Sequence, residues 1–263
     1  IDSDTIIANA GYSLEIFQNE KLLGIKKILD RGSTHAVSNI ELNRLAAEYH
    51  TVYWKSNGKR FLNRELLEYD IADKILVPTS FVRDTFKENG IVDDKLVKIP
   101  YPLSLKKFDG LQKTSNGKSK SVLYVGQISP LKGIGVLVDA MNLVRETLHD
   151  VELWLVGPMN PMVKPSVIDF PWIKYYGVQK GQNLYDCYLQ ASVYCMLSFQ
   201  EGMSLTLAEA AFCKLPILAT LNSGVLELDS YYKNYAIVPV GDPRTTAVKI
   251  IEALENVEKS NYY

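Results

Sequence analysis

The sequence is poor in the residues that build metal and redox sites. Its 263 residues include three histidines and three cysteines, and it has no C-x-x-C, no H-E-x-x-H and no cluster of histidines. Cys187, Cys195 and Cys213 all lie among apolar or aromatic neighbours, which favours reduced core residues in a cytoplasmic protein over a disulfide framework. The only D-x-D, at residues 2–4, immediately precedes a predicted strand, and a solvated strand entry explains it better than a metal site.

Long apolar runs and strong net charge are also missing. No run approaches the roughly 18 apolar residues of a membrane span, and no stretch has the pattern of a signal peptide. The net charge is −1, and the slight basic excess of residues 1–120 is too weak to indicate nucleic-acid binding. That excess is compatible with an anionic or membrane-linked acceptor, although random scatter is the simpler explanation. With 47% hydrophobic and 22% charged residues, the chain has an ordinary globular composition.

The second half alternates regularly between apolar runs of strand length and helical patterns. Continuous apolar runs indicate strands that helices cover on both faces, so the alternation predicts a parallel, doubly wound sheet. We expect strands at 121–125, 151–156, 173–176, 193–197, 216–220 and 236–240, and helices at 134–148, 184–191, 204–213 and after Pro243.

The first half shows a similar but shorter alternation. It predicts strands at 5–8, 25–29, 75–77 and 96–99, and helices at 12–23, 38–49, 65–72 and 80–89. Residues 50–64 mix aromatic and basic groups without periodicity, which predicts a surface loop, with acceptor or membrane-surface contact as the alternative. Residues 109–120 have the polar, Gly- and Ser-containing composition of a linker. We therefore expect an α/β protein with two doubly wound domains, 1–108 and 121–263, which face each other across a cleft.

Two glutamates stand out in the segment from Ser198 to Gly224. Glu201 follows a predicted strand in a polar loop, where its carboxylate can meet solvent or a ligand. Glu209 lies in a predicted helix that is apolar almost all round, and a buried carboxylate needs hydrogen-bond donors. A distant Arg, Lys or backbone amide and the hydroxyls of a ligand are equally good sources of those donors.

The pattern Glu201-Gly202, Glu209-Ala210 and then residues 215–220 (LPILAT) resembles the signature of family 4 of the retaining glycosyltransferases, which have the GT-B fold. Residues 71–80 and 98–102 also resemble the end of that family's first domain. The resemblance implies that Glu201 contacts the transferred sugar or the acceptor, and that Glu209 contacts the ribose of the nucleotide. It also implies an incomplete first domain, because several βα units that normally precede residues 5–8 are not found.

The resemblance further implies that a nucleotide diphosphate is held without a metal or cofactor, by cations, amides and helix N-termini. Gly126, Gln127 and Lys132 lie between a predicted strand and a predicted helix, and Lys132 is the natural phosphate partner. The family usually has Arg where this chain has Gln127, so a bidentate cation is replaced by a neutral amide.

The start of the helix that carries Glu209 is the second part of the predicted site. Backbone amides in its first turn are expected to meet sugar hydroxyls or phosphate oxygens, and Ser204 is also a candidate N-cap. The substrate-binding residues expected here are Gly202, Met203, Ser204, Leu205 and Thr206. At the other end of the helix, Lys214 stands where the family usually has Gly, which predicts a strained left-handed residue.

In the first half, Arg31 and His35 lie in a loop that follows a predicted strand. By resemblance this is the loop whose histidine approaches the donor sugar. His35 is therefore expected to line the cleft as a catalytic residue beside Glu201 and Lys132, and Arg31 to serve the acceptor or the phosphate.

Together these features predict a metal-independent retaining transferase that moves a hexose from a UDP- or GDP-sugar to a glycan or lipid-linked acceptor. A lipid-linked acceptor would place this cytoplasmic protein at the inner face of the membrane. A sugar-nucleotide epimerase of the same fold is a rival, which the two glutamates disfavour. A decayed or non-catalytic nucleotide-sugar binding protein is the other, favoured by Gln127 and the incomplete first domain.

Overall fold

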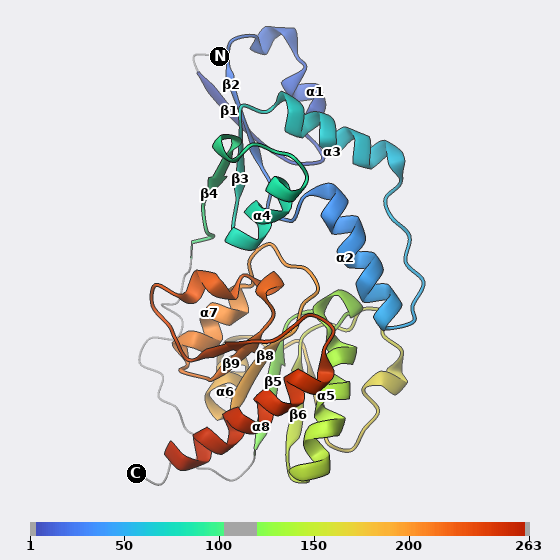
Figure 1. Cartoon of the computed structure of the whole chain (residues 1–263), viewed down its shortest axis with the longest axis vertical. Coiled ribbons are helices and arrows are strands. Elements are labelled where there is room, and N and C mark those ends of the chain that lie inside the picture. Colours follow the sequence, from blue (N-terminus) through green and yellow to red (C-terminus); the bar gives the residue numbers. More distant parts are fainter. Residues whose placement is uncertain (1–3, 103–119, 261–263) are drawn as a thin grey trace.

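The computed structural model describes residues 4–102 and 120–260, and it contains two separate parallel sheets (Figure 1). The first sheet has four strands in the order β1-β2-β3-β4. Its strands are β1 (Thr5–Asn9), β2 (Lys26–Asp30), β3 (Lys74–Val77) and β4 (Leu96–Lys98). The helices that connect them are α1 (Leu14–Phe17), α2 (Ala36–Tyr49), α3 (Lys59–Ile71) and α4 (Ser80–Glu88).

The second sheet has six parallel strands in the order β10-β9-β8-β5-β6-β7. Its strands are β5 (Ser121–Val125), β6 (Glu152–Val156), β7 (Ile173–Gly177), β8 (Val193–Met196), β9 (Ile217–Ala219) and β10 (Tyr235–Ile237). Its helices are α5 (Ile134–Thr147), α6 (Gly181–Gln190), α7 (Leu205–Phe212) and α8 (Pro243–Ser260). The chain builds outward from β5 in one direction and from β8 in the other, so the pair β5/β8 is the switch point where ligands bind in such sheets.

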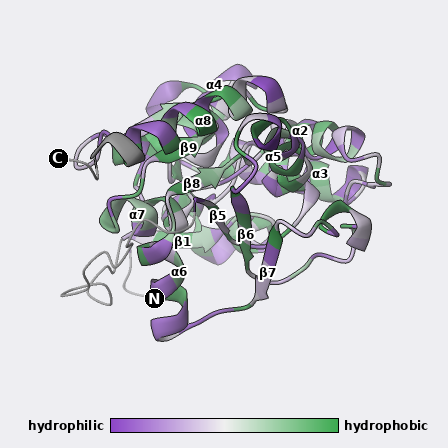
Figure 2. Ribbon diagram, turned by 90° about the horizontal axis from the view of Figure 1, so that it is seen from below, coloured by the Kyte–Doolittle hydropathy of each residue, from purple (hydrophilic) through white to green (hydrophobic). Residues whose placement is uncertain are grey.

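The predicted α/β architecture is confirmed, and most elements lie within three residues of their expected ends. Continuous burial of β5 and β8 explains the success in the second half, and the core strands are among the hydrophobic segments of Figure 2. All three cysteines are buried and free, as expected for core residues. The linker predicted at 109–120 lies outside the described residues except for Lys120.

Two predictions in the first half are wrong. The helix expected at 12–23 ends after Phe17, because the Asn19 side chain accepts a hydrogen bond from the Lys21 amide and starts a separate 3-10 turn. The loop expected at 50–64 ends at Gly58, where α3 begins and packs Leu62 and Leu66 against the first core. Gly58 has φ of 89°, which lets the chain turn sharply into the helix.

Helix α2 connects the two cores. Ala36, at its start, belongs to the core of the first sheet, and Ala46, near its end, belongs to the core of the second. In Figure 1 this helix runs from the first domain down to α5. The hydroxyl of Tyr49 donates a hydrogen bond to Asp139 of α5 at 2.7 Å. The two sheets are therefore held by one shared helix as well as by the loops described below.

Candidate active site

Lys132 and Glu201 meet at the carboxyl ends of β5 and β8. Lys132 ends the turn that follows β5, and Glu201 lies in the loop after β8, so the switch point of the sheet brings together residues 69 positions apart. The Lys132 Nζ lies 2.5 Å from Glu201 Oε1, and the side chains are 21% and 14% exposed. The Ser198 hydroxyl donates a second hydrogen bond to the same oxygen at 3.1 Å. The pair is therefore partly buried, ordered and still accessible.

Main-chain contacts fix the position of this pair. The Phe199 amide donates to the Leu131 carbonyl at 2.9 Å, which ties the loop after β8 to the turn that carries Lys132. Gly133 has φ of 70°, and a Cβ at this position would lie 2.1 Å from the Leu197 carbonyl oxygen. Only glycine fits there, because a side chain would require both a left-handed backbone and displacement of β8's loop.

Glu209 receives a hydrogen bond from a residue in the preceding helix of the sheet. The Tyr188 hydroxyl of α6 donates to Glu209 Oε2 at 2.7 Å, and Tyr188 is fully buried. One donor to Glu209 is thus a hydroxyl 21 positions away in the sequence. Tyr188 therefore orients one carboxylate oxygen of Glu209, which lies one turn after Leu205 in α7.

The hydroxyl groups at the start of α7 form a short chain. Tyr194 donates to Thr206 Oγ1 at 2.7 Å, and Thr206 Oγ1 lies 2.9 Å from Ser204 Oγ. Ser204 occupies the N-cap position, but its side chain makes no capping hydrogen bond, so its hydroxyl is used by Thr206 instead. Leu205 is 46% exposed.

Gly126, Gln127 and Lys132 lie between β5 and α5, as expected. Gly126 directly follows β5 and Gly157 directly follows β6, and a Cβ on Gly157 would lie 1.9 Å from the Gly126 carbonyl oxygen. The backbone carbonyl of Gln127 accepts a hydrogen bond from Tyr124, while the residue itself is exposed. Gln127, which the resemblance places at an arginine position, is therefore open to solvent.

The loop after Glu201 presses against the first domain. A Cβ at Gly202 would lie 1.8 Å from the Gly32 carbonyl oxygen, and the Thr79 hydroxyl donates to the Gly202 carbonyl at 3.0 Å. The Gln200 amide donates to Ser33 Oγ at 2.7 Å. The adjacent Met203 Sδ accepts the Tyr101 amide at 3.3 Å. Glu201 therefore lies at the junction of the two domains.

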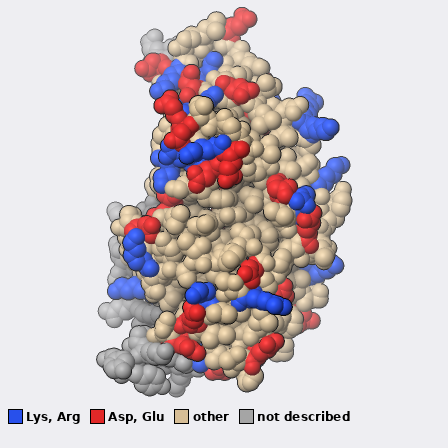
Figure 3. Space-filling model, in the orientation of Figure 1, with Lys and Arg blue, Asp and Glu red and all other residues tan. Residues whose placement is uncertain are grey.

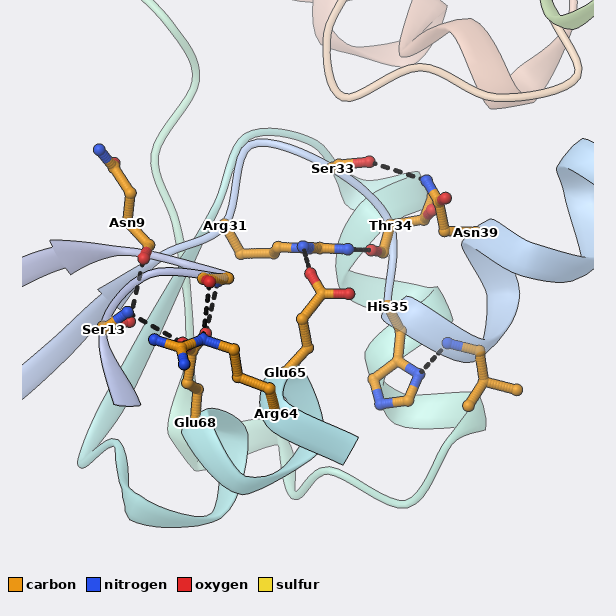
Figure 4. Close-up of polar contacts among 12 residues, drawn as sticks. Asn9, Ser13, Arg31, Ser33, Thr34, His35, Asn39, Arg64, Glu65 and Glu68 are labelled. Carbon is orange, nitrogen blue, oxygen red and sulfur yellow. Dashed lines mark hydrogen bonds and ion pairs between the residues drawn. The ribbon is translucent and has the colours of Figure 1, made fainter. Parts of the chain in front are cut away.

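His35 and Arg31 lie in the interior of the first domain (Figure 4). His35 is 2% exposed, packs against Tyr69 and Phe86, and accepts the Val37 amide through Nδ1 as the N-cap of α2. Burial, with a further contribution from Arg31, lowers the pKa of His35 to about 4. Arg31 is paired with Glu65 and donates twice to the Thr34 carbonyl. The structure gives both side chains structural partners, and their roles toward substrate stay predictions.

Sequence reasoning missed three residues that shape the site. Tyr188 orients Glu209, and Gln200 reaches across to Ser33. His50, at the end of α2, accepts the Gly135 amide of α5 through Nε2 at 2.8 Å. Each contact joins residues far apart in the sequence, so no local pattern signals it.

The remaining features are the surface charges, the possible metal ligands and the apolar helices of the described residues. Blue and red side chains are interspersed on the face seen in Figure 3, without an extended basic area. Within residues 4–102 and 120–260, no group of three His, Cys, Asp or Glu residues is placed to hold a metal ion. In the same part of the chain, no helix is long and apolar enough to cross a membrane.

Comparison with known proteins identifies the family of the chain. The family model described as glycosyl transferases group 1 matches residues 119–256, which is more than half of the chain. The chain belongs to the glycosyl transferases group 1. The matched segment contains Lys132, Glu201 and Glu209. It also contains all six strands of the second sheet.

The similar curated proteins are longer than this chain. The phosphatidylinositol N-acetylglucosaminyltransferase GPI3 subunit of Saccharomyces cerevisiae is 26% identical over 202 residues, which cover 68% of this chain and 43% of that protein. An uncharacterized glycosyltransferase of Haemophilus influenzae is 23% identical over 209 residues, covering 77% and 57%. The chain therefore spans about half the length of the curated relatives it matches.

Solved structures share the fold. Sucrose-phosphate synthase from Thermosynechococcus elongatus has a TM-score of 0.74 and 20% identity over 97% of this chain and 65% of that one. HepE of Anabaena, solved in complex with UDP and glucose, has a TM-score of 0.70 and 16% identity over 97% and 69%. These matches span both domains and identify the architecture as that of GT-B glycosyltransferases.

Proposed function

We propose that this group 1 glycosyltransferase moves a hexose from a UDP- or GDP-sugar to a glycan or lipid-linked acceptor, with retention of configuration and without a metal. The observation that carries the proposal is the Lys132–Glu201 pair, which lies at the switch point of the second sheet, where the next residue, Gly202, lies against Gly32 of the first domain. A donor between the domains would meet both charges.

The residues divide the work by charge. Lys132 supplies a cation for the diphosphate, whose negative charge grows as the sugar leaves, and this is electrostatic stabilisation of the departing group. Glu201 is held by Lys132 and Ser198 and is available to the transferred sugar or the incoming hydroxyl. Glu209, oriented by Tyr188, is the partner for the ribose hydroxyls. The closed contact between Gly202 and Gly32 limits water at the reacting atoms.

The acceptor class in this proposal is supported by the names of the relatives and not by the geometry of the site. The yeast relative is named for transfer of N-acetylglucosamine to phosphatidylinositol, and the Staphylococcus aureus structure of TarM was solved with fondaparinux, α-GlcNAc-glycerol and UDP. These names support a glycan or lipid-linked acceptor.

A non-catalytic nucleotide-sugar binding protein is the second candidate. The exposed Gln127 favours it, because a neutral side chain stands where related enzymes place a bidentate cation. Such a protein would bind UDP or GDP through Lys132 and Glu209 and would transfer nothing.

Two measurements separate these functions. Calorimetric titration with UDP and GDP tests the nucleotide site, and an assay with labelled nucleotide sugars, scored for both hydrolysis and transfer, tests the reaction. Nucleotide binding with turnover supports the transferase, and binding without turnover supports the second candidate. If neither UDP nor GDP binds, both candidate functions are contradicted.

A further inference from the structure

A second cavity lies between α2 and α3, away from the Lys132–Glu201 pair. Its volume is about 180 Å³. Two aromatic rings, three amides and one carboxylate supply its chemical groups: Trp54, Phe61, Asn39, Asn43, Asn57 and Glu65. We call this cavity the α2–α3 pocket.

The polar groups of this pocket have unused hydrogen-bonding capacity. Glu65 is 6% exposed, and its Oε1 pairs with Arg31, while within the described residues no hydrogen bond reaches its Oε2 (Figure 4). The amide of Asn43 donates to the carbonyl and to Oδ1 of Asn39. In the described part of the chain, neither the Trp54 indole N–H nor the Asn57 side chain has a hydrogen-bond partner. Because Oε2 of the Glu65 carboxylate accepts no hydrogen bond from the described residues, it can accept one from a ligand hydroxyl.

The size and charge of the pocket restrict that ligand. A volume of this size is below the ~300 Å³ at which sites for drug-sized ligands begin, so a nucleotide is excluded. Among the residues that the structure describes, no Lys or Arg lines the pocket, and its one charged group is the Glu65 carboxylate, which disfavours phosphates and carboxylates. Aromatic rings beside amides match a small molecule that has one apolar face and a rim of hydroxyls.

We propose that the α2–α3 pocket binds one neutral hexopyranose unit. Its C–H face packs on Trp54 or Phe61, and its hydroxyls donate to Glu65 Oε2 and exchange hydrogen bonds with the Asn43 and Asn57 amides. The use of this sugar as part of the acceptor rests on the proposed function; a free sugar in the same pocket would instead be a regulator.

The pocket is connected to the candidate active site by hydrogen bonds. Asn39 donates to Ser33 Oγ at 3.2 Å, and the same oxygen accepts Gln200, the neighbour of Glu201. A ligand that displaces Asn39 would therefore be felt at the loop that carries Glu201.

The test uses the full 263-residue chain and saturation-transfer NMR with methyl glycosides of glucose, mannose, galactose and N-acetylglucosamine. At least one glycoside should bind, and Trp54→Ala should weaken it by about tenfold, the upper range for a lost aromatic contact. Tyr53→Ala is the matched control, because Tyr53 is the adjacent aromatic residue, is 84% exposed and does not line the pocket. Asn43→Ala provides a second variant that keeps α2 helical, should Trp54→Ala fail to fold.

Further arms identify the source and the charge of the ligand. If the bound sugar is part of an acceptor, an oligosaccharide should bind more tightly than the corresponding methyl glycoside, and Trp54→Ala should remove this increase in affinity. If the sugar is a free regulator, added sugar units should not increase the affinity. Tighter binding of glucose 6-phosphate than of glucose would overturn the neutral assignment. The proposal would be overturned if no glycoside binds, or if a glycoside binds equally well to Trp54→Ala, Asn43→Ala and Tyr53→Ala. UDP titration of the same samples reports on the proposed function separately.

Discussion

Lys132→Ala should weaken binding of the diphosphate part of the nucleotide and leave binding of the nucleoside part unchanged. The Lys132 Nζ lies 2.5 Å from Glu201 and is 21% exposed, so it is already held at the switch point before a ligand arrives. A hydrogen bond to a charged group contributes about 1.5–3 kcal/mol. We therefore expect UDP to bind roughly ten- to hundredfold more weakly to Lys132→Ala, while uridine, which has no phosphate, binds unchanged.

Glu201→Gln gives the opposite result and makes the test specific. A neutral amide releases Lys132 from its ion pair, so UDP should bind as well as before or more tightly, while any sugar transfer falls. Calorimetry with UDP and uridine measures both variants, and Lys180→Ala, which removes an exposed lysine of the same domain, is the control. Thermal unfolding checks the fold, because loss of a partly buried pair costs about 1–2 kcal/mol. An equal loss for UDP and uridine, or weaker UDP binding in Glu201→Gln, would refute the assignment.

Four further predictions concern single residues. Glu209→Ala should weaken both UDP and uridine by about 1–3 kcal/mol, and unchanged titration curves for a folded variant would remove the ribose role. Gln127→Arg should tighten UDP but not uridine, and indifference would show that a cation at this position is not missing. Lys214→Gly should raise the stability to urea by up to about 1 kcal/mol, because Lys214 has φ of 57°; a lower midpoint would contradict this strain. His50 has a pKa lowered mainly by burial and is neutral when it accepts the Gly135 amide. As pH falls below about 6.5, the unfolded chain therefore takes up the proton before the folded protein does, and the free energy of unfolding decreases. In urea unfolding, His50→Asn should show a smaller decrease with falling pH than the parent. His149→Asn, which changes an exposed histidine, is the control and should show the same decrease as the parent.

The second domain was predictable because its signal is local. The residues of β5 and β8 form continuous apolar runs, and in the structure every one of them is buried. The left-handed backbone at Lys214 was also predicted, and the structure confirms it. Lys132 and Glu201 follow neighbouring strands of one parallel sheet, so the topology alone accounts for their meeting.

The first domain was harder because its contacts are not local. Glu68 of α3 accepts the amides of Ser13 and Leu14 at 2.9 and 3.0 Å, and this buried carboxylate organises a segment more than 50 residues away. The sequence around Glu68 contains nothing that indicates such a role. His35 raises the same difficulty. The sequence does not distinguish an exposed loop histidine from a buried N-cap, and only the folded structure shows that His35 packs against Tyr69 and Phe86.

The candidate active site depends on how firmly the two domains are held together. Direct polar contacts join them at Gln200–Ser33, Thr79–Gly202 and Ser80–Glu227, and Lys98 adds an ion pair to the last. Each contributes on the order of 1 kcal/mol, so separating the loops costs a few kcal/mol in addition to the packing of α2. On the proposed function, a donor that contacts Lys132 and the first-domain loop together would favour the arrangement in which these loops touch, by its differential affinity for that arrangement. Gly202 and Gly32 touch without side chains between them, so the backbones of the two domains meet directly beside Glu201.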